Sequence, residues 1–203
     1  MTAIVSIYVG SAVYALVRYV AFAPKNAESI PVFILNKGIS MAAAICLAVG
    51  FLQAWRLGRG RAVSPAPSVW FRAGTFGAVW HIPMSLVVLR PEYFKEFFRA
   101  PDASMPGRLS FEGEMVFLLG GATAALLFLL LRPQWSGVAR RRIAIAAMAT
   151  LLGHVLTMGY CRGLNINASH AYLPPMWLLS VVAVVLGLWW LVRDRQSGGG
   201  APS

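Results

Sequence analysis

Two of the three histidines in this chain lie deep inside long apolar runs, where an ionised or unpaired polar side chain is costly. His81 occurs in FGAVWHIPMS and His154 in TLLGHVLTMG. An imidazole in such a place can ligate a metal, transfer a proton or form a hydrogen bond to a neighbouring helix. Which chemistry applies depends on where the surrounding elements place the two rings.

The two histidines occupy matched positions in their runs. His81 follows Trp70, near the start of its run, by nearly the same number of residues as His154 follows Arg142. Because these two runs cross in the same direction, a rise of about 1.5 Å per residue places the rings within about 2 Å of the same depth. Two imidazoles at one depth on parallel helices can hold a flat cofactor from its two faces. Since paired axial histidines are typical of a low-spin haem that carries electrons, we expect a haem here.

Other interpretations of the histidines are considered beside this one. A single histidine in a membrane helix is more typical of a hydrogen bond between helices. A zinc site is disfavoured, because two ligands are too few and neither a carboxylate nor a cysteine occurs at the same depth. The third histidine, His170 in NINASHAY, is interpreted as a surface residue, with a quinone site or a proton relay as the alternative.

Small residues and buried cations support the cofactor interpretation. Gly74 and Gly77 precede His81 at helical spacing, so they share its face and predict a groove that is free of bulky side chains. Arg18 and Lys37 lie inside the first two runs, where charges are rare and usually paired or functional. We expect both cations to neutralise the propionates of the haem; the alternative is that their side chains extend to the membrane surface.

The composition indicates which elements position these residues. The chain has 203 residues, of which 58% are hydrophobic and 12% are charged. Soluble domains have about a quarter charged residues, so a multi-pass membrane protein is predicted. Because a backbone in lipid must satisfy its own hydrogen bonds, and strand-like alternation is absent, we expect an all-α bundle of six transmembrane helices. The apolar runs are 4–22, 30–55, 69–89, 115–131, 143–160 and 171–192. Residues 1–193 form one domain, and residues 194–203 are expected to be a flexible cytoplasmic tail.

Arginines gather on one side of the predicted bundle. They follow the second and fourth runs, in WRLGRGR and RPQWSGVARRR, and also follow the sixth run. By the positive-inside rule this side is the cytoplasm, so both termini are expected there. The same distribution accounts for the net charge of +11 without a basic face suited to nucleic acid. The expected partner is therefore the lipid bilayer and not a nucleic acid.

The longest loop on the other side begins RPEYFKEFFRAP. Its aromatic residues Tyr93, Phe94, Phe97 and Phe98 recur at roughly helical spacing among charges. This pattern predicts a short amphipathic helix that lies on the outer membrane surface. The alternative is a loop that the rest of the protein covers.

The order of these features resembles the ferric-reductase-like transmembrane domain superfamily. The resemblance rests on the six runs, on WFRAGTFGAVWH at the third and on RRRIAIAAMATLLGH at the fifth, and it covers about residues 8–192. That superfamily includes the haem-binding membrane subunit of the bacterial methionine sulfoxide reductase system. The resemblance implies that His81 and His154 ligate haem b in a bacterial cytoplasmic membrane. It also implies a quinol or flavin donor and an acceptor or partner reductase at the outer face.

A departure from the superfamily limits the expectation to one haem. Members that bind two haems carry a second histidine in each of the two spans, about four turns from the first. The equivalent positions here hold Pro67, Lys95, Arg140 and Ala168. Since one haem alone does not bridge both membrane faces, a flavin, a quinone or a partner protein must complete the route.

Two other classes of function are compatible with the same fold. A cofactor-free small membrane carrier would use the histidines and Lys37 to line a polar path, whereas an assembly or scaffold protein would need no cofactor. Proton-coupled carriers usually use carboxylates in mid-span, and the apolar runs contain none. If the chain serves an enzyme, we expect it to be the membrane electron-transfer subunit of an oxidoreductase.

Overall fold

The structure is a computed structural model of the whole chain, and it describes most but not all residues. The described residues are 1–22, 31–58, 68–91, 93–102, 104–132, 134–135, 137–160 and 173–193. Two sequence-based expectations, the surface position of His170 and the flexible tail at 194–203, lie outside these residues.

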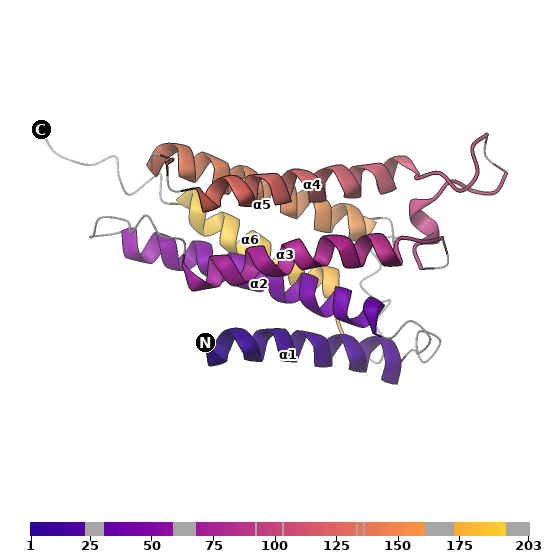
Figure 1. Cartoon of the computed structure of the whole chain (residues 1–203), viewed down its shortest axis with the longest axis horizontal. Helices are drawn as coiled ribbons and strands as arrows, with labels where there is room; N and C mark the ends of the chain where they lie inside the picture. Colours follow the sequence, from indigo (N-terminus) through magenta and orange to yellow (C-terminus); the bar gives the residue numbers. More distant parts are fainter. Residues whose placement is uncertain are drawn as a thin grey trace, which may run out of the picture.

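The described part of the chain folds into six α-helices that run alternately up and down (Figure 1). They are α1 (Thr2–Leu16), α2 (Val32–Gly58), α3 (Val69–Val88), α4 (Phe111–Leu131), α5 (Gly137–Tyr160) and α6 (Met176–Arg193). A short π-helix, η1 (Val17–Ala21), extends α1. The predicted all-α bundle is therefore confirmed, with α3 and α5 parallel as their positions in the chain require.

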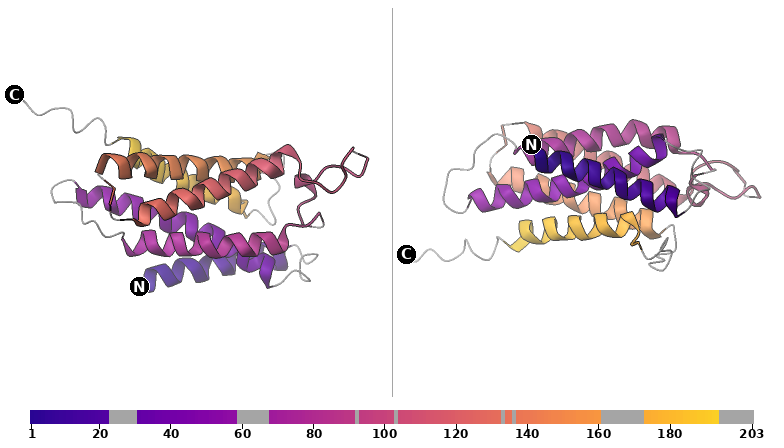
Figure 2. Two further views of the ribbon diagram at one scale, coloured as in Figure 1. Left: turned by 45° about the horizontal axis from the view of Figure 1, so that its top comes forward. Right: turned by 90° about the horizontal axis from the view of Figure 1, so that it is seen from below.

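Four of these helices are long and apolar enough to cross a membrane. They are α1 with its π-helical extension, most of α2, α4 and α5. The apolar part of α6 is shorter, Met176–Val192, and α3 is not in this set although it has 20 residues. Arg72, His81 and Pro83 lower the hydropathy of α3. The prediction of six spans thus holds for four helices by length and composition, while α3 and α6 lie alongside them in the bundle (Figure 2).

The outside of the bundle is apolar, and α3 and α6 share this property. Large hydrophobic side chains are exposed on α3 at Phe76 and Trp80, and on α6 at Val185 and Leu186. The other helices expose further examples, among them Val9, Val13, Phe117, Leu118 and Phe128. An exposed apolar surface of this extent is typical of a protein that contacts lipid, since soluble monomers keep such patches small. The apolar exterior therefore indicates a membrane protein.

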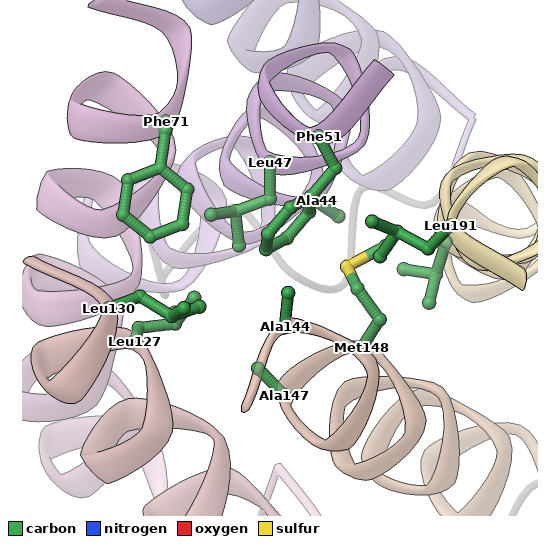
Figure 3. Close-up of a cluster of buried hydrophobic side chains, with 11 residues drawn as sticks. Ala44, Leu47, Phe51, Phe71, Leu127, Leu130, Ala144, Ala147, Met148 and Leu191 are labelled. Carbon is green, nitrogen blue, oxygen red and sulfur yellow. The ribbon is translucent and has the colours of Figure 1, made fainter. Parts of the chain in front are cut away.

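Two clusters of buried side chains lie at opposite ends of the bundle. We call the end where α1, α3 and α5 begin the terminal end, and the opposite end the loop end. Figure 3 shows the terminal-end cluster, to which α2 to α6 all contribute. It contains Ala44, Leu47, Phe51, Phe71, Leu127, Leu130, Ala144, Ala147, Met148, Val184 and Leu191. The loop-end cluster contains Ala15, Tyr19, Phe33, Ile34, Met41, Val88, Phe94, Phe97 and Met176.

Serine caps fix where two helices of the bundle begin. Ser68 accepts a hydrogen bond from the backbone N–H of Phe71 at 3.2 Å, and this bond starts α3. Ser110 accepts from the N–H of Gly113, also at 3.2 Å, and starts α4. These bonds satisfy N–H groups that have no partner inside the helix. Both caps set the register of the helix that follows, and hence the height of its cavity-facing residues.

The segment between α3 and α4 corrects one expectation. Instead of an amphipathic surface helix it forms only a short 3-10 turn, η3 (Lys95–Phe97). Phe94 and Phe97 are buried and stacked, with ring centroids 5.3 Å apart. The prediction was wrong because these rings pack into the loop-end cluster instead of into a membrane surface. The chain then turns back through a hydrogen bond from Arg99 N–H to Arg108 O at 2.8 Å.

Candidate functional site

A cavity of about 340 Å³ lies in the loop-end half of the bundle, between α2, α3, α4, α5 and α6. Its walls are mostly apolar, and this combination of size and lining is typical of cofactor pockets, which span about 300–1,000 Å³. The stacked pair Phe94 and Phe97 contributes to its loop-end wall, and Leu47 lies toward the terminal end. His81 and His154 both line the cavity, so the structure brings together the two residues that the sequence paired by depth.

The rings of His81 and His154 face the same small space. Their centroids are 6.5 Å apart and their planes are nearly perpendicular, at 84°. Metal–imidazole bonds are about 2.0–2.1 Å long. If both rings bound one metal ion from opposite sides, two such bonds and the two distances from nitrogen to ring centre would add up to about the observed distance between the ring centroids. Perpendicular ring planes are compatible with this arrangement, because each ring can rotate about its own bond to the metal.

Hydrogen bonds orient both imidazoles. His154 Nδ1 lies 2.8 Å from the carbonyl oxygen of Val116 on α4, and a carbonyl can only accept. Nδ1 of His154 therefore donates, which leaves the lone pair on Nε2. His81 Nδ1 lies 2.6 Å from Oδ1 of Asn36 on α2, and the same reasoning places its proton on Nδ1. A ligating histidine usually donates its second N–H in this way, so both hydrogen bonds favour the tautomer that leaves Nε2 available to bind a metal.

Ser85 lies next to the His81 ring. Its Oγ is 3.3 Å from Nδ1 and 3.3 Å from Nε2. Because the lone-pair directions of the two ring nitrogens diverge, an atom equidistant from both lies along neither. The Ser85 hydroxyl instead has Asn36 Oδ1 as an acceptor, at 3.2 Å. The Nε2 lone pair of His81 thus does not point at Ser85.

Gly120 on α4 gives His154 access to its acceptor. A Cβ at position 120 would lie 3.1 Å from His154 Nδ1 and 3.2 Å from Cε1, which is tighter than ordinary van der Waals contact. A Cβ at the next residue, Gly121, would meet nothing within 4 Å. Glycine at position 120 therefore lets the imidazole approach α4 closely enough to reach Val116 O.

The predicted glycine groove faces a helix instead of the cavity. A Cβ at Gly74 would clash with Leu47 of α2, and one at Gly77 would clash with the Tyr8 hydroxyl and approach Ala43. Neither glycine lines the cavity. Both share the face of His81, but closer to the terminal end, where this face packs directly on α2. Their role is the close approach of two helices, and the assignment of Gly74 and Gly77 to cofactor contact is corrected accordingly.

The two buried cations have different surroundings. Lys37 lines the cavity, and its Nζ lies 4.9 Å from the ring centroid of Phe94 and 5.5 Å from that of Phe33. The ammonium group therefore sits at the loop-end part of the cavity, beneath the aromatic residues that close it. An ammonium at this place offers a positive charge to an anionic group of a bound molecule.

Arg18 contacts the chain just before α6 and does not line the cavity. Its Nη1 donates to the carbonyl oxygens of Leu173 and, at 3.0 Å, of Pro174, just before α6. Tyr14 donates to the same Pro174 oxygen at 2.5 Å. Arg18 belongs to the π-helix η1, a local widening that is frequent at functional positions. Here it turns Arg18 toward the chain before α6 and Tyr19 toward the cavity, so Arg18 is not among the residues that line the candidate site.

The donor set fits a metal that brings ligands of its own. Within the residues that the structure describes, no group of three or more His, Cys, Asp or Glu side chains could hold a metal ion. Two imidazoles alone are too few for a bare zinc ion. A haem supplies four equatorial nitrogens and needs only axial ligands, which His81 and His154 can provide. The terminal-end cluster fills the other half of the interior.

Three residues of the site were missed by the sequence analysis: Asn36, Ser85 and Gly120. Asn36 is adjacent to Lys37 in ILNKGIS, and a second polar residue in that run was a usable signal. Gly120 is part of a Gly-Gly pair in the leucine-rich fourth run, and this pair was a second usable signal. Ser85 shares the face of His81 one turn later, where a hydroxyl alone is too common to indicate a site.

No protein-family model matches the chain, and no curated protein matches it.

Proposed function

We propose that this chain is a b-type membrane electron-transfer protein that holds one haem between His81 and His154. The observation that carries the proposal is the pair of imidazoles, 6.5 Å apart, with both Nδ1 atoms donating to oxygen acceptors. Such a pair presents two ring lone pairs to one space. The same residues carry the resemblance to the ferric-reductase-like superfamily, which supports the same function.

Each cavity residue then has a physical task. His81 and His154 hold the iron, while Asn36 and the Val116 carbonyl keep the rings in position. Lys37 offers a positive charge to the propionates at the loop end. The apolar walls exclude water, which favours transfer of an electron without a coupled side reaction. The haem, when bound, supplies one-electron chemistry at its iron.

The direction across the membrane follows from the arginine distribution. We place the protein in a bacterial cytoplasmic membrane with both termini in the cytoplasm, so that the loop end faces outward. The cavity lies in the loop-end half, so the haem is closer to an outer-face acceptor or partner reductase than to the cytoplasm. One haem in the loop-end half does not reach the cytoplasmic face. We therefore propose that a quinol or a flavin donates electrons to it.

The test is the absorption spectrum of the whole chain, purified in detergent from haem-replete cells. A reduced-minus-oxidised spectrum should show the bands of a low-spin haem b at about one haem per chain. His81→Ala and His154→Ala should each abolish the low-spin signal, because the iron loses an axial ligand. His170→Ala is the matched control and should leave the spectrum unchanged.

Two results would contradict the proposal. A colourless wild-type protein would leave the cofactor-free carrier or scaffold as the better explanation of the cavity. A low-spin spectrum that survives in His81→Ala or His154→Ala would mean that the iron has other ligands.

A further inference from the structure

The two proposed ligands are held in different ways. His154 donates to a backbone carbonyl, Val116 O, whose position is fixed by the α4 helix. His81 donates to a side chain, Asn36 Oδ1. A change of side chain can thus alter the partner of His81, while the partner of His154 would persist. The difference makes Asn36 the adjustable element of the site.

Asn36 is well placed to act on His81 and on little else. Its side chain is 2% exposed, and it lines the cavity. The distance of 2.6 Å to His81 Nδ1 is shorter than the 2.8 Å between His154 Nδ1 and its carbonyl. Ser85 donates to the same Asn36 oxygen at 3.2 Å, which helps to hold the amide with its oxygen toward the histidine. Three residues on two helices therefore form one chain of hydrogen bonds that ends at the His81 ring.

The strength of the acceptor at Nδ1 determines how strongly the imidazole donates electrons through Nε2. A stronger acceptor makes the ring more basic, and a more basic ligand stabilises the oxidised, more positive iron. A neutral amide is an acceptor of intermediate strength, between a carboxylate and no acceptor. The identity of residue 36 should therefore influence the reduction potential as well as the position of the ring.

We propose that Asn36 is a positioning residue that fixes the His81 ring and sets the reduction potential of the bound haem. This inference rests on the proposed function, because it requires His81 to be a haem ligand. It adds a residue on α2, a helix that carries neither of the two proposed iron ligands.

The experiment compares wild type with Asn36→Asp, Asn36→Leu and Ser11→Ala in the purified full chain. Ser11 is the matched control: its side chain is as buried as that of Asn36, at 2% exposed, but it lies on α1 and does not line the cavity. The measurements are haem content, the low-spin electron paramagnetic resonance signal and the midpoint potential from a redox titration.

The two substitutions should shift the midpoint potential in opposite directions. Asn36→Asp provides a stronger acceptor, so the potential should fall. Asn36→Leu provides none, so the potential should rise, and the affinity for haem should drop by about 10- to 100-fold, as is typical when a partner of a metal ligand is lost. Ser11→Ala should match wild type. If Asn36→Leu retains too little haem to titrate, the sign of the shift in Asn36→Asp decides.

Failure of the inference is distinguishable from failure of the proposed function. A wild-type protein without haem refutes both, before any variant is measured. A wild-type protein with low-spin haem whose potential is the same in Asn36→Asp, Asn36→Leu and Ser11→Ala refutes only the role of Asn36. An upward shift in Asn36→Asp would also overturn it.

Discussion

At the terminal end of the bundle, Phe71, Leu127 and Met148 meet in a filled aliphatic and aromatic core, whereas at the loop end the same five helices part around a cavity. The contrast is visible along one face of α4. Toward the loop end this face carries Gly113 and Gly120, and toward the terminal end it carries Leu127. Gly120 leaves room for His154, and Gly113 allows close contact with Phe97, whereas Leu127 fills the interior about two turns beyond Gly120.

The comparison separates two tasks that a bundle of this size must combine. The filled half supplies packing energy, since buried aliphatic and aromatic side chains contact many neighbours. The hollow half gives up some of this packing, and its polar groups are held by specific hydrogen bonds. Substitutions in the two halves should therefore change different properties, namely stability in one and cofactor content in the other.

The largest effect should come from filling the cavity. Ala124 on α4 lines it, so Ala124→Phe would place a large ring where the cofactor is proposed to bind. The haem-to-protein ratio should fall to near zero. The stability of the haem-free protein should change little, because the ring enters open space and avoids the strain of a packed core. Pyridine haemochrome assay and detergent unfolding measure the two quantities.

The neighbouring residue provides the control for this substitution. Ala125 is exposed on the outside of the same helix, so Ala125→Phe should keep the wild-type haem content. Equal haem content in the two variants would mean that the cavity is not the binding site.

An intermediate effect is expected in the filled half. Phe71 is 6% exposed and meets Phe51 edge-on, with ring centroids 5.5 Å apart. Phe71→Ala should lower the free energy of unfolding by about 3–5 kcal/mol, because it removes a buried ring and leaves a cavity. The chains that remain folded should bind haem with an unchanged spectrum.

Phe76 is the matched residue on the same helix and is 64% exposed. Phe76→Ala should cost less than about 0.5 kcal/mol, as for most substitutions at exposed positions. Titration with a denaturing detergent, followed by circular dichroism, compares the two. The contrast between the halves would be lost if Phe71→Ala altered the haem spectrum and left stability intact.

The smallest of the three effects is expected where Gly120 of α4 contacts the His154 ring. Gly120→Ala would press a methyl group against His154 Nδ1, so the ring must move away from Val116 O. We expect haem affinity to fall by about tenfold, at the low end of the range for a disturbed partner of a metal ligand. Gly121 lines the same cavity, but a methyl group there would not contact His154, so Gly121→Ala should lower haem affinity less than Gly120→Ala does. Haem transfer to apomyoglobin measures both, and indistinguishable rates would argue against the role of Gly120.

The helices and the matched depth of the histidines were accessible from the sequence. A helix in lipid needs a long apolar run, and its fixed rise converts residue counts into depth. This reasoning placed His81 and His154 near one another without any knowledge of packing. The structure agrees, since their rings share one cavity.

The direction of individual side chains was not accessible in this way. Gly74 and Gly77 share the face of His81, but whether that face meets α2 or a cavity depends on how the two helices diverge along their length. Arg18 points toward the chain before α6 because the π-helix changes the local rotation, which a regular helical pattern does not reveal. Phe94 and Phe97 point inward because they pack against other buried side chains of the loop-end cluster.

The dependence of α3 on α2 has a consequence for how the protein is made. α3 is not among the helices that are long and apolar enough to cross a membrane, whereas most of α2 is, and the two helices pack closely at Gly74. A newly synthesised α3 therefore gains most by entering the membrane as a hairpin with α2. His81 then reaches its depth while His154 is still to be translated. The cavity can be completed only after α6 has been made, because this last helix contributes part of its wall.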